Sequence, residues 1–314
     1  MGTLVGHVAP GFAFLALGLW HLLNHIKRHS LQPNSYISTP WFPSSKVRYI
    51  ELYLIMLGSS ISIAMELFIG PKKHQPFADG TIPSNHIHNF EHATIALTFF
   101  TYAAFAILLD RNHFKRNTRD ALTQLLGAIA FAQQLLLFHL HSADHTGVEG
   151  QYHLLLQIVI LVSLATTLIG IALPGSFLIS FVRSASIFFQ GAWLILMGYM
   201  LWTPEFIPKG CFINFEEGHQ VVRCHGEVAL HRAKSLVNLE FSWFLVGITI
   251  FSVCFYVILG RVIGEKVEYA TLSREDEYIS DDVESQEDTK YGASKSSFVG
   301  AGKEGFVASI DIER

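Results

Sequence analysis

Charged residues are scarce in this chain, and several familiar catalytic patterns are absent from it. Only 15% of the 314 residues are Asp, Glu, Lys or Arg, and the formal net charge at pH 7 is -4. A net negative chain disfavours nucleic-acid binding. The sequence contains no His-Glu-x-x-His, no Cys-x-x-Cys pair and no Ser-His-Asp pattern. Established zinc and hydrolase signatures are therefore excluded, and no internal repeat of the transporter kind is evident.

Apolar sequence is abundant and is grouped into long runs. Hydrophobic residues make up 50% of the chain, and a membrane-spanning helix needs about 20 mostly apolar residues. We therefore predict an all-α, polytopic membrane protein, a bundle of seven transmembrane helices within residues 1–262. The predicted spans are Val8–Ile26, Val47–Ile69, Ala93–Leu109, Ala121–Leu140, Leu154–Leu173, Phe177–Leu201 and Leu236–Leu259.

The distribution of basic residues predicts how these spans are oriented. Lysine and arginine are concentrated in the linkers that follow odd-numbered spans, and such residues mark the cytoplasmic side. The members of this set are Lys27, Arg28, Lys46, Arg48, Arg111, Lys115, Arg116, Arg119, Arg261 and Lys266. We therefore expect a lumenal or extracellular N-terminus and a cytoplasmic C-terminus, in the endomembrane system or the plasma membrane, with the lipid bilayer as the main partner.

Two of the three cysteines lie in one predicted lumenal loop. Cys211 and Cys224 fall between spans six and seven, where an oxidising compartment would allow a disulfide. Spacing alone does not establish the bond, so two unpaired loop thiols are the alternative.

The segment from residue 263 to residue 314 differs in character from the rest of the chain. It is rich in acidic residues and serine and poor in large apolar side chains, which predicts a disordered cytoplasmic tail. Tyr269 and Leu272 have the spacing of a tyrosine-based sorting signal, which would bind adaptor complexes. An inert linker is the alternative.

Histidines and acidic residues collect at the predicted lumenal ends of the spans. Imidazole and carboxylate groups at this density suit zinc or another divalent metal. His88 and His92 are four residues apart and so share one helical face. The candidate metal ligands are His7, Glu66, His88, His92, His139, His141, Asp144, His145, His153 and His231. The alternative is a wet vestibule in which the histidines are simply hydrogen-bonded.

Polar residues at the opposite ends of the spans have simpler interpretations. His21 and His25 are expected to form a basic rim at the membrane interface, and Arg183 is expected to extend to that interface. Glu51 is expected to pair with a neighbouring basic residue, namely Lys46, Arg48 or Arg183. Glu240, near the start of span seven, is expected to join the lumenal histidines or to carry protons.

Several separate segments resemble one known family. They include Gly6-His7-Val8-Ala9-Pro10-Gly11, the pair His139 and His141 with His153, and Phe189-Gln190-Gly191-Ala192-Trp193. Over roughly residues 1–262 the chain resembles the transmembrane protein 45 family, also catalogued as DUF716, and plant members in particular. The resemblance implies a multi-pass membrane protein without a settled activity, some plant members having been linked to responses to viral attack. It also implies that Gln190 and Trp193 face the interior of the bundle.

Three functions remain open from the sequence. The first is a divalent-metal site at the lumenal face; if it is enzymatic, it would be a metal-dependent hydrolase with Asp144 or Glu66 as general base, although an enzyme is disfavoured. The second is a transporter or channel lined by Glu66, Gln190, Glu240 and the histidines, against which the cytoplasmic half of the spans is poor in polar residues. The third is a trafficking scaffold acting through the tail. Haem held by His92 and His139 is a further alternative.

Overall fold

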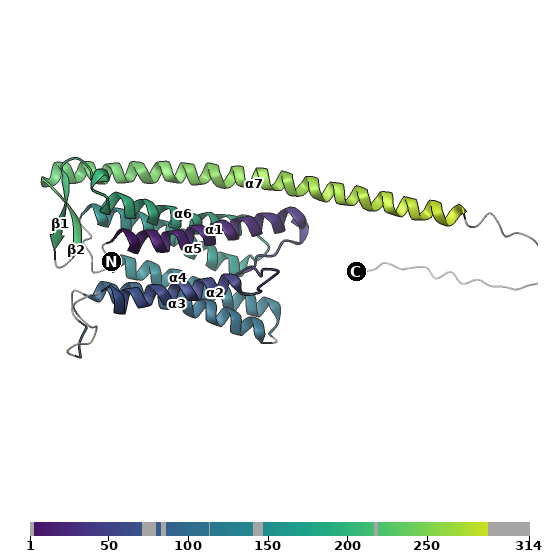
Figure 1. The fold of residues 1–314 in the computed structure, drawn as a ribbon, viewed down its shortest axis with the longest axis horizontal. Helices are drawn as coiled ribbons and strands as arrows, with labels where there is room; N and C mark the ends of the chain where they lie inside the picture. Colours follow the sequence, from purple (N-terminus) through teal and green to yellow (C-terminus); the bar gives the residue numbers. More distant parts are fainter. Residues whose placement is uncertain are drawn as a thin grey trace, which may run out of the picture. The chain divides into compact units, whose positions relative to one another are not determined.

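The computed structural model describes residues 3–70, 80–82, 86–112, 114–140, 147–216 and 219–287. Seven of its helices are long and apolar enough to cross a membrane, which confirms the predicted number (Figure 1). Proline and glycine at 174 and 175 separate the fifth helix from the sixth, as expected. The helices are α1 (Leu4–Leu31), α2 (Ile50–Ala64), α3 (Ile87–Arg111), α4 (Arg116–His139), α5 (Val148–Ala172), α6 (Phe177–Trp202) and α7 (Gly226–Glu287).

Helix α7 continues beyond its apolar part, which ends at Gly264. The chain divides into two compact units, residues 1–264 and 265–314. The acidic segment that was expected to be disordered is helical up to Glu287, because its glutamates, lysine, alanine and leucine are good helix formers. The sorting-signal candidates Tyr269 and Leu272 fall on this helical segment, and residues 288–314 lie outside the described residues.

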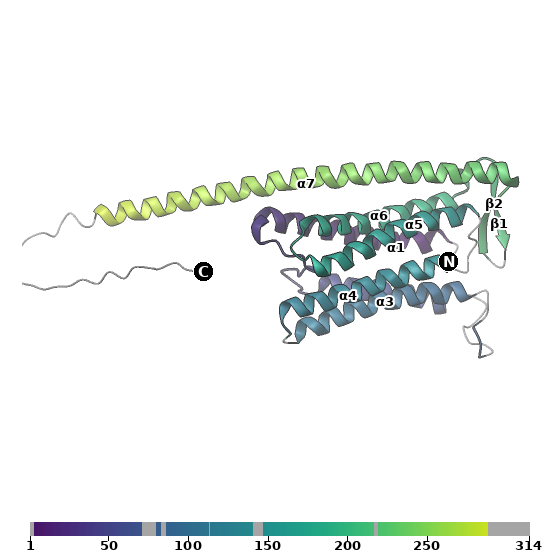
Figure 2. The ribbon, with the colours of Figure 1, turned by 180° about the vertical axis from the view of Figure 1, so that it is seen from behind.

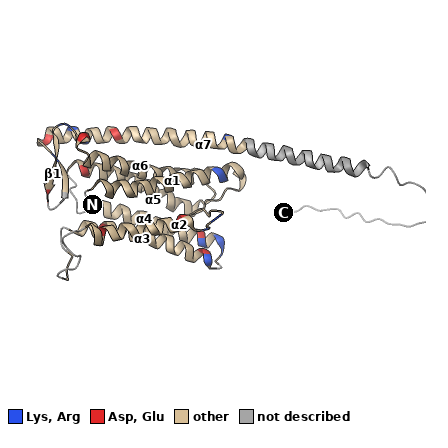
Figure 3. Ribbon diagram, in the orientation of Figure 1, with Lys and Arg blue, Asp and Glu red and all other residues tan. Residues whose placement is uncertain are grey.

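Neighbouring helices run in opposite directions through the bundle. Contacts link them in the order α2, α3, α4, α5, α6 and α1, and Figure 2 shows α3, α4 and α5 from the other side. One end carries His7, Glu66, His92, His139 and His153 and is called the histidine end. The other end carries Arg28, Arg48, Arg111, Arg116 and Arg119 and is called the basic end; the blue ribbon segments there mark lysine and arginine (Figure 3).

Glycines bring the backbones of α1 and α6 into direct contact. A Cβ atom on Gly18 would lie 2.2 Å from the backbone nitrogen of Phe188, and one on Gly191 would lie 2.2 Å from the backbone nitrogen of Leu15. Small residues allow this approach between apolar helices. The contact fixes α1 and α6 together, and these two helices carry His7, His21, His25, Arg183 and Gln190, which are described below.

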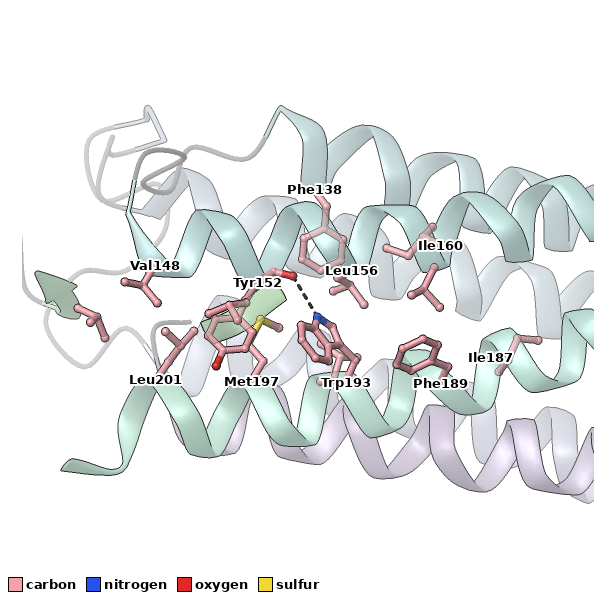
Figure 4. Packing of buried hydrophobic residues seen from close by; sticks show 14 of the residues in the cluster. Phe138, Val148, Tyr152, Leu156, Ile160, Ile187, Phe189, Trp193, Met197 and Leu201 are labelled. Carbon is pink, nitrogen blue, oxygen red and sulfur yellow. Dashed lines mark hydrogen bonds between the residues drawn. The ribbon is translucent and has the colours of Figure 1, made fainter. Parts of the chain in front are cut away.

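An apolar core lies between α4, α5 and α6, close to the histidine end. Trp193 is fully buried there, and its indole Nε1 donates to the backbone oxygen of Tyr152 at 3.1 Å (Figure 4). Phe138, Leu156 and Met197 belong to the same cluster. Trp193 therefore faces the interior, as the family resemblance implied.

A β-hairpin between α6 and α7 was not predicted from the sequence. Strands β1 (Cys211–Glu216) and β2 (His219–Cys224) pair antiparallel, with Cys211 opposite Cys224. The two cysteines form a disulfide. Val221 and Val222 are buried, and such β-branched residues favour strands. The predicted all-α fold is therefore mostly helical with one small sheet.

Candidate functional site

At the histidine end, Glu66 is held by the first turns of α3. It lies on η2 (Met65–Ile69), a π-helical turn that follows α2 and places the carboxylate in the interior, where it is 2% exposed. Asn89 Nδ2 donates to Glu66 Oε2 at 2.7 Å, and His92 Nδ1 lies 3.2 Å from Glu66 Oε1. π-Helical turns occur frequently at functional sites.

A second pair at this end joins the first turns of α1 and α5. The ring centroids of His7 and His153 are 5.8 Å apart, and His7 stacks on Trp202. Nδ1 of His7 lies 3.2 Å from the backbone oxygen of Thr3, and Nδ1 of His153 lies 3.0 Å from that of Glu149. A carbonyl oxygen accepts only, so Nδ1 carries the proton on each neutral ring and the lone pair is on Nε2.

One aromatic ring connects the two pairs. Phe138 stacks on His153 with ring centroids 5.6 Å apart and lies 6.3 Å from the ring of His92. The structure therefore brings four sequence-predicted residues, Glu66, His92, His7 and His153, to one region from α1, η2, α3 and α5.

Two other candidates lie beside this region. The His88 ring centroid is 6.4 Å from that of His92, as their spacing on one helix predicted. His139 is more exposed, and its Nδ1 lies 3.2 Å from Gln157 Oε1.

The remaining candidates are placed differently. His231 has a side chain that is 80% exposed and lies 3.8 Å from Glu227, one turn away on the same helix. His141, Asp144 and His145 lie outside the described residues. Across the part of the chain that the structure describes, no group of three or more His, Cys, Asp or Glu side chains is arranged to hold a metal ion.

Glu240 does not join the histidines. It accepts a hydrogen bond from the Tyr152 hydroxyl at 2.6 Å, and Gln151 Nε2 donates to Asn238 Oδ1 beside it. These bonds attach α7 to α5, so the expected cluster of Glu240 with His92 and His139 is wrong.

A second polar cluster, which the sequence did not predict, is buried at the basic end. Its centre is Glu51, in the first turn of α2 and 5% exposed. His21 Nε2 lies 2.7 Å from Glu51 Oε1, while Trp20 Nε1 and the backbone nitrogen of Phe42 both donate to Glu51 Oε2 at 2.9 Å. Glu51 therefore pairs with His21 of α1, and the expected pairing with a lysine or arginine is wrong.

The second ring nitrogen of His21 is available. Its Nε2 donates to the Glu51 carboxylate, so the neutral ring carries its lone pair on Nδ1. That atom is buried and has no hydrogen-bond partner among the described residues. A carboxylate that orients one nitrogen of a histidine and leaves the other open is a common arrangement in proton-transfer and ligand sites.

Arg183 extends this cluster from α6. The residue is 4% exposed, and its Nη2 donates to Ser38 Oγ at 3.1 Å and faces His25 Nε2 at 3.4 Å. Because a guanidinium only donates, His25 Nε2 accepts and the ring proton is on Nδ1, 2.7 Å from the Tyr36 hydroxyl. Burial raises the pKa of Tyr36, so its hydroxyl stays protonated at neutral pH.

The cluster is buried because residues 32–49 fold over it. Ser38 donates from its backbone nitrogen to the Pro174 oxygen at 2.7 Å, and Tyr102 donates to the Pro40 oxygen at 3.0 Å. Tyr36, Trp41 and Phe42 in this segment are also buried. His21, His25 and Arg183 are all buried, so the expectations of a basic rim at the membrane interface and of an Arg183 side chain that extends to that interface are wrong. The aromatic residues of the linker 32–49 are the feature of the sequence that could have indicated that this segment covers the cluster.

Buried polar side chains also lie near the middle of α5 and α6. Gln190 Nε2 donates to Ser163 Oγ at 2.7 Å, and the hydroxyls of Ser163 and Ser186 are 2.8 Å apart. Ser186 also donates to the backbone oxygen of Arg183 at 2.8 Å. Gln190 is fully buried and its Oε1 has no hydrogen-bond partner in the described part of the chain.

The seven long apolar helices are consistent with a multi-pass membrane protein. Ionisable side chains are buried at both ends of the bundle. The model of a family described as a family of unknown function (DUF716) matches residues 120–257. This match supports a relation to that family from α4 into the apolar part of α7. The matched part contains Arg183, Ser163, Ser186 and Gln190, whereas Glu51 and the histidines of α1 precede it.

Proposed function

We propose that this protein is a transporter or channel-like membrane protein that moves protons, with or without a small polar solute, between the two membrane faces. The supporting observation is the buried Ser163, Ser186 and Gln190 set, which lies between the ionisable clusters at the two ends. As part of the proposal, the N-terminus is lumenal or extracellular and the basic end faces the cytoplasm.

The spacing of the clusters suits a path across a bilayer. His7 and His25 are separated by 18 residues of α1, or about 27 Å along a helix that rises 1.5 Å per residue. The hydrocarbon core is about 30 Å thick, so the two clusters lie near its opposite faces. Arg183 and Gln190 are about 10 Å apart along α6 by the same rise. Gln190 therefore lies between the cluster at the basic end and the cluster at the histidine end.

Polar groups at these positions are expensive unless they have a use. Burying a hydroxyl or amide costs free energy that a packed apolar residue would avoid, and intramembrane His, Glu and Arg commonly mark ion and proton pathways. The sequence suggested that the cytoplasmic half of the spans is poor in polar residues, which counted against a transporter. This expectation is wrong, because four polar side chains are buried at the basic end, namely Glu51, His21, His25 and Arg183.

The proposal predicts proton movement that depends on Gln190. We expect vesicles that contain the purified protein and a pH-sensitive dye to acidify faster than empty vesicles under an imposed pH gradient, in a medium with chloride, sulfate and phosphate. Gln190→Leu should reduce the protein-dependent rate about 10-fold, since removing one buried polar contact changes a barrier by about 1.4 kcal/mol.

Thr166→Val is the matched control. Thr166 lies near Ser163 on α5, but its hydroxyl donates only to the backbone oxygens of Val162 and Ser163. Its rate should equal that of the unchanged protein. Folded protein that gives the same rate as empty vesicles would contradict the transport proposal.

A divalent-metal site at the histidine end is a second candidate. It is favoured by the convergence of His7 with His153 and of Glu66 with His92 at one end of the bundle. The lone pairs on Nε2 of neutral imidazoles are the usual metal ligands.

This candidate predicts bound metal in the purified protein. Elemental analysis should find zinc or another divalent metal in stoichiometric amount, and His139→Ala together with His141→Ala should remove it. His231→Ala should retain it, because that side chain is exposed. Visible absorbance of the same sample tests for haem, and metal-free protein from metal-supplemented cells would count against the site.

A further inference from the structure

We infer that the basic-end cluster binds a small oxyanion at Arg183 and takes up one proton on Nδ1 of His21 as the anion binds. This inference rests on the proposed transport function and deepens it, because it names the solute class and the coupled ion. The oxyanion is a phosphate, sulfate or carboxylate group, either free in solution or on a lipid headgroup.

Arg183 places a positive charge in the interior of the basic end. A guanidinium stays protonated in proteins, and a buried charge is normally paired. Within the described residues Arg183 forms no ion pair, and its Nη2 makes hydrogen bonds to neutral partners, Ser38 and His25. The planar donor set of arginine matches the oxygens of an oxyanion. An anion therefore supplies the partner that the fold omits.

The buried carboxylate at the basic end, Glu51, already has partners. Both oxygens of Glu51 are occupied by His21, Trp20 and the backbone of Phe42. Among the described residues no ion pair joins Glu51 to Arg183, although both are buried at the basic end of the bundle. Glu51 and Arg183 are the buried charged residues of this region, and their opposite charges sum to zero as long as His21 and His25 are neutral, whereas Arg28 is partly exposed to solvent.

A bound anion changes the sum of the buried charges at the basic end. It brings one uncompensated negative charge into a region of low dielectric, where net charge is costly. A proton from solution restores neutrality when it binds the lone pair on Nδ1 of His21 and forms an imidazolium beside Glu51. His25 does not serve, because the Arg183 guanidinium faces its Nε2 and its Nδ1 already holds a proton.

The charged and titratable groups around His21 come from every element packed against it. His25 and Arg28 lie on its own helix, Glu51 on α2, Tyr102 on α3, Arg183 on α6 and Tyr36 on the covering segment. The His21 and His25 ring centroids are 5.9 Å apart, and Arg183 is in contact with His25. Nδ1 of His21 is the group in this set with an open lone pair among the described residues.

The surroundings favour the approach of an anion. Five arginines lie at the same end of the bundle (Figure 3); Arg48, Arg116 and Arg119 pair there with Asp110 and Asp120, and Arg28 and Arg111 add to the positive charge. A concentration of basic residues raises the local concentration of anions and their association rate. The neutral anion-plus-proton pair is also the form that crosses a low-dielectric interior at least cost.

Titration calorimetry on the full-length protein in detergent tests both halves of the inference. Methyl sulfate is the free probe and dihexanoyl phosphatidylglycerol is the lipid probe; each carries one negative charge and neither titrates near neutral pH. Measurement in two buffers of different ionisation enthalpy should give an uptake of about one proton per bound anion, by linkage between the two binding steps. The probe that binds more tightly identifies the source of the oxyanion.

Four variants separate the roles. Arg183→Gln should weaken binding about 100-fold, as expected for the loss of a charge-assisted bidentate contact, and Arg183→Lys should recover part of the loss. His21→Gln keeps a donor toward Glu51 but has no second nitrogen to protonate, so anion binding should become weaker and proton uptake should vanish. His29→Gln, on the same helix and stacked on Phe177, should match the unchanged protein.

The outcomes are distinguishable from those of the transport test. Absence of binding of both probes to the unchanged protein would overturn the inference even if vesicles showed proton flux. Binding with no proton uptake, or uptake that persists in His21→Gln, would overturn the role of His21. Binding with the expected uptake but without flux would leave this site standing and reject transport.

Discussion

Leucine in place of Gly191 should leave the protein largely unfolded or aggregated in detergent, whereas leucine in place of Gly58 should be tolerated. A Cβ at Gly191 would lie 2.2 Å from the Leu15 backbone nitrogen and 2.6 Å from the Gly11 backbone oxygen. Neither backbone atom can move without separating α1 from α6. We expect a loss of about 4 kcal/mol or more, above the 1–3 kcal/mol typical of overpacked cores.

Gly58 is the matched control because it is also a glycine inside an apolar helix. A Cβ there would meet nothing within 4 Å. Size-exclusion profiles and thermal unfolding of the two variants in the same detergent measure the difference. Equal behaviour of the two variants would show that α1 and α6 are not in close backbone contact.

Much of the fold was predictable because hydropathy and chain direction are local properties. Each of the seven apolar runs is long enough to be recognised alone. Because successive helices alternate in direction, the starts of α1, α3 and α5 and the end of α2 lie at the same end of the bundle. For this reason the convergence of His7, Glu66, His92 and His153 could be predicted before any side-chain contact was known.

Specific contacts were not predictable in the same way. His21 and Glu51 are 30 residues apart and meet because residues 32–49 cover the basic end. Arg183 reaches Ser38 across 145 residues, and nothing near either residue in the sequence indicates this pairing. A linker rich in proline and aromatic residues was interpreted as a connection between spans, although three of its aromatic side chains are buried. The hairpin was missed because its strands are only six residues long.

Removal of the Glu51 side chain should have the second large effect. Glu51→Ala leaves three donors without an acceptor, namely His21 Nε2, Trp20 Nε1 and the Phe42 backbone nitrogen. Each unsatisfied buried donor costs about 1–3 kcal/mol, and the other buried charge at this end, Arg183, is then left without a buried charge of opposite sign. We expect thermal unfolding in detergent to show a loss of about 3–5 kcal/mol, with greater protease sensitivity in residues 32–49.

Two further variants separate charge from shape. Glu227→Ala removes a carboxylate that is 83% exposed, so it should change stability by less than about 0.5 kcal/mol. Glu51→Gln keeps the volume and an acceptor oxygen for Trp20 and Phe42 but turns an amide donor toward His21. Its loss should be intermediate, because the neutral His21 ring can move its proton to Nδ1 and accept through Nε2. If Glu51→Gln were as unstable as Glu51→Ala, the charge of Glu51 rather than its hydrogen bonds would hold the basic end together.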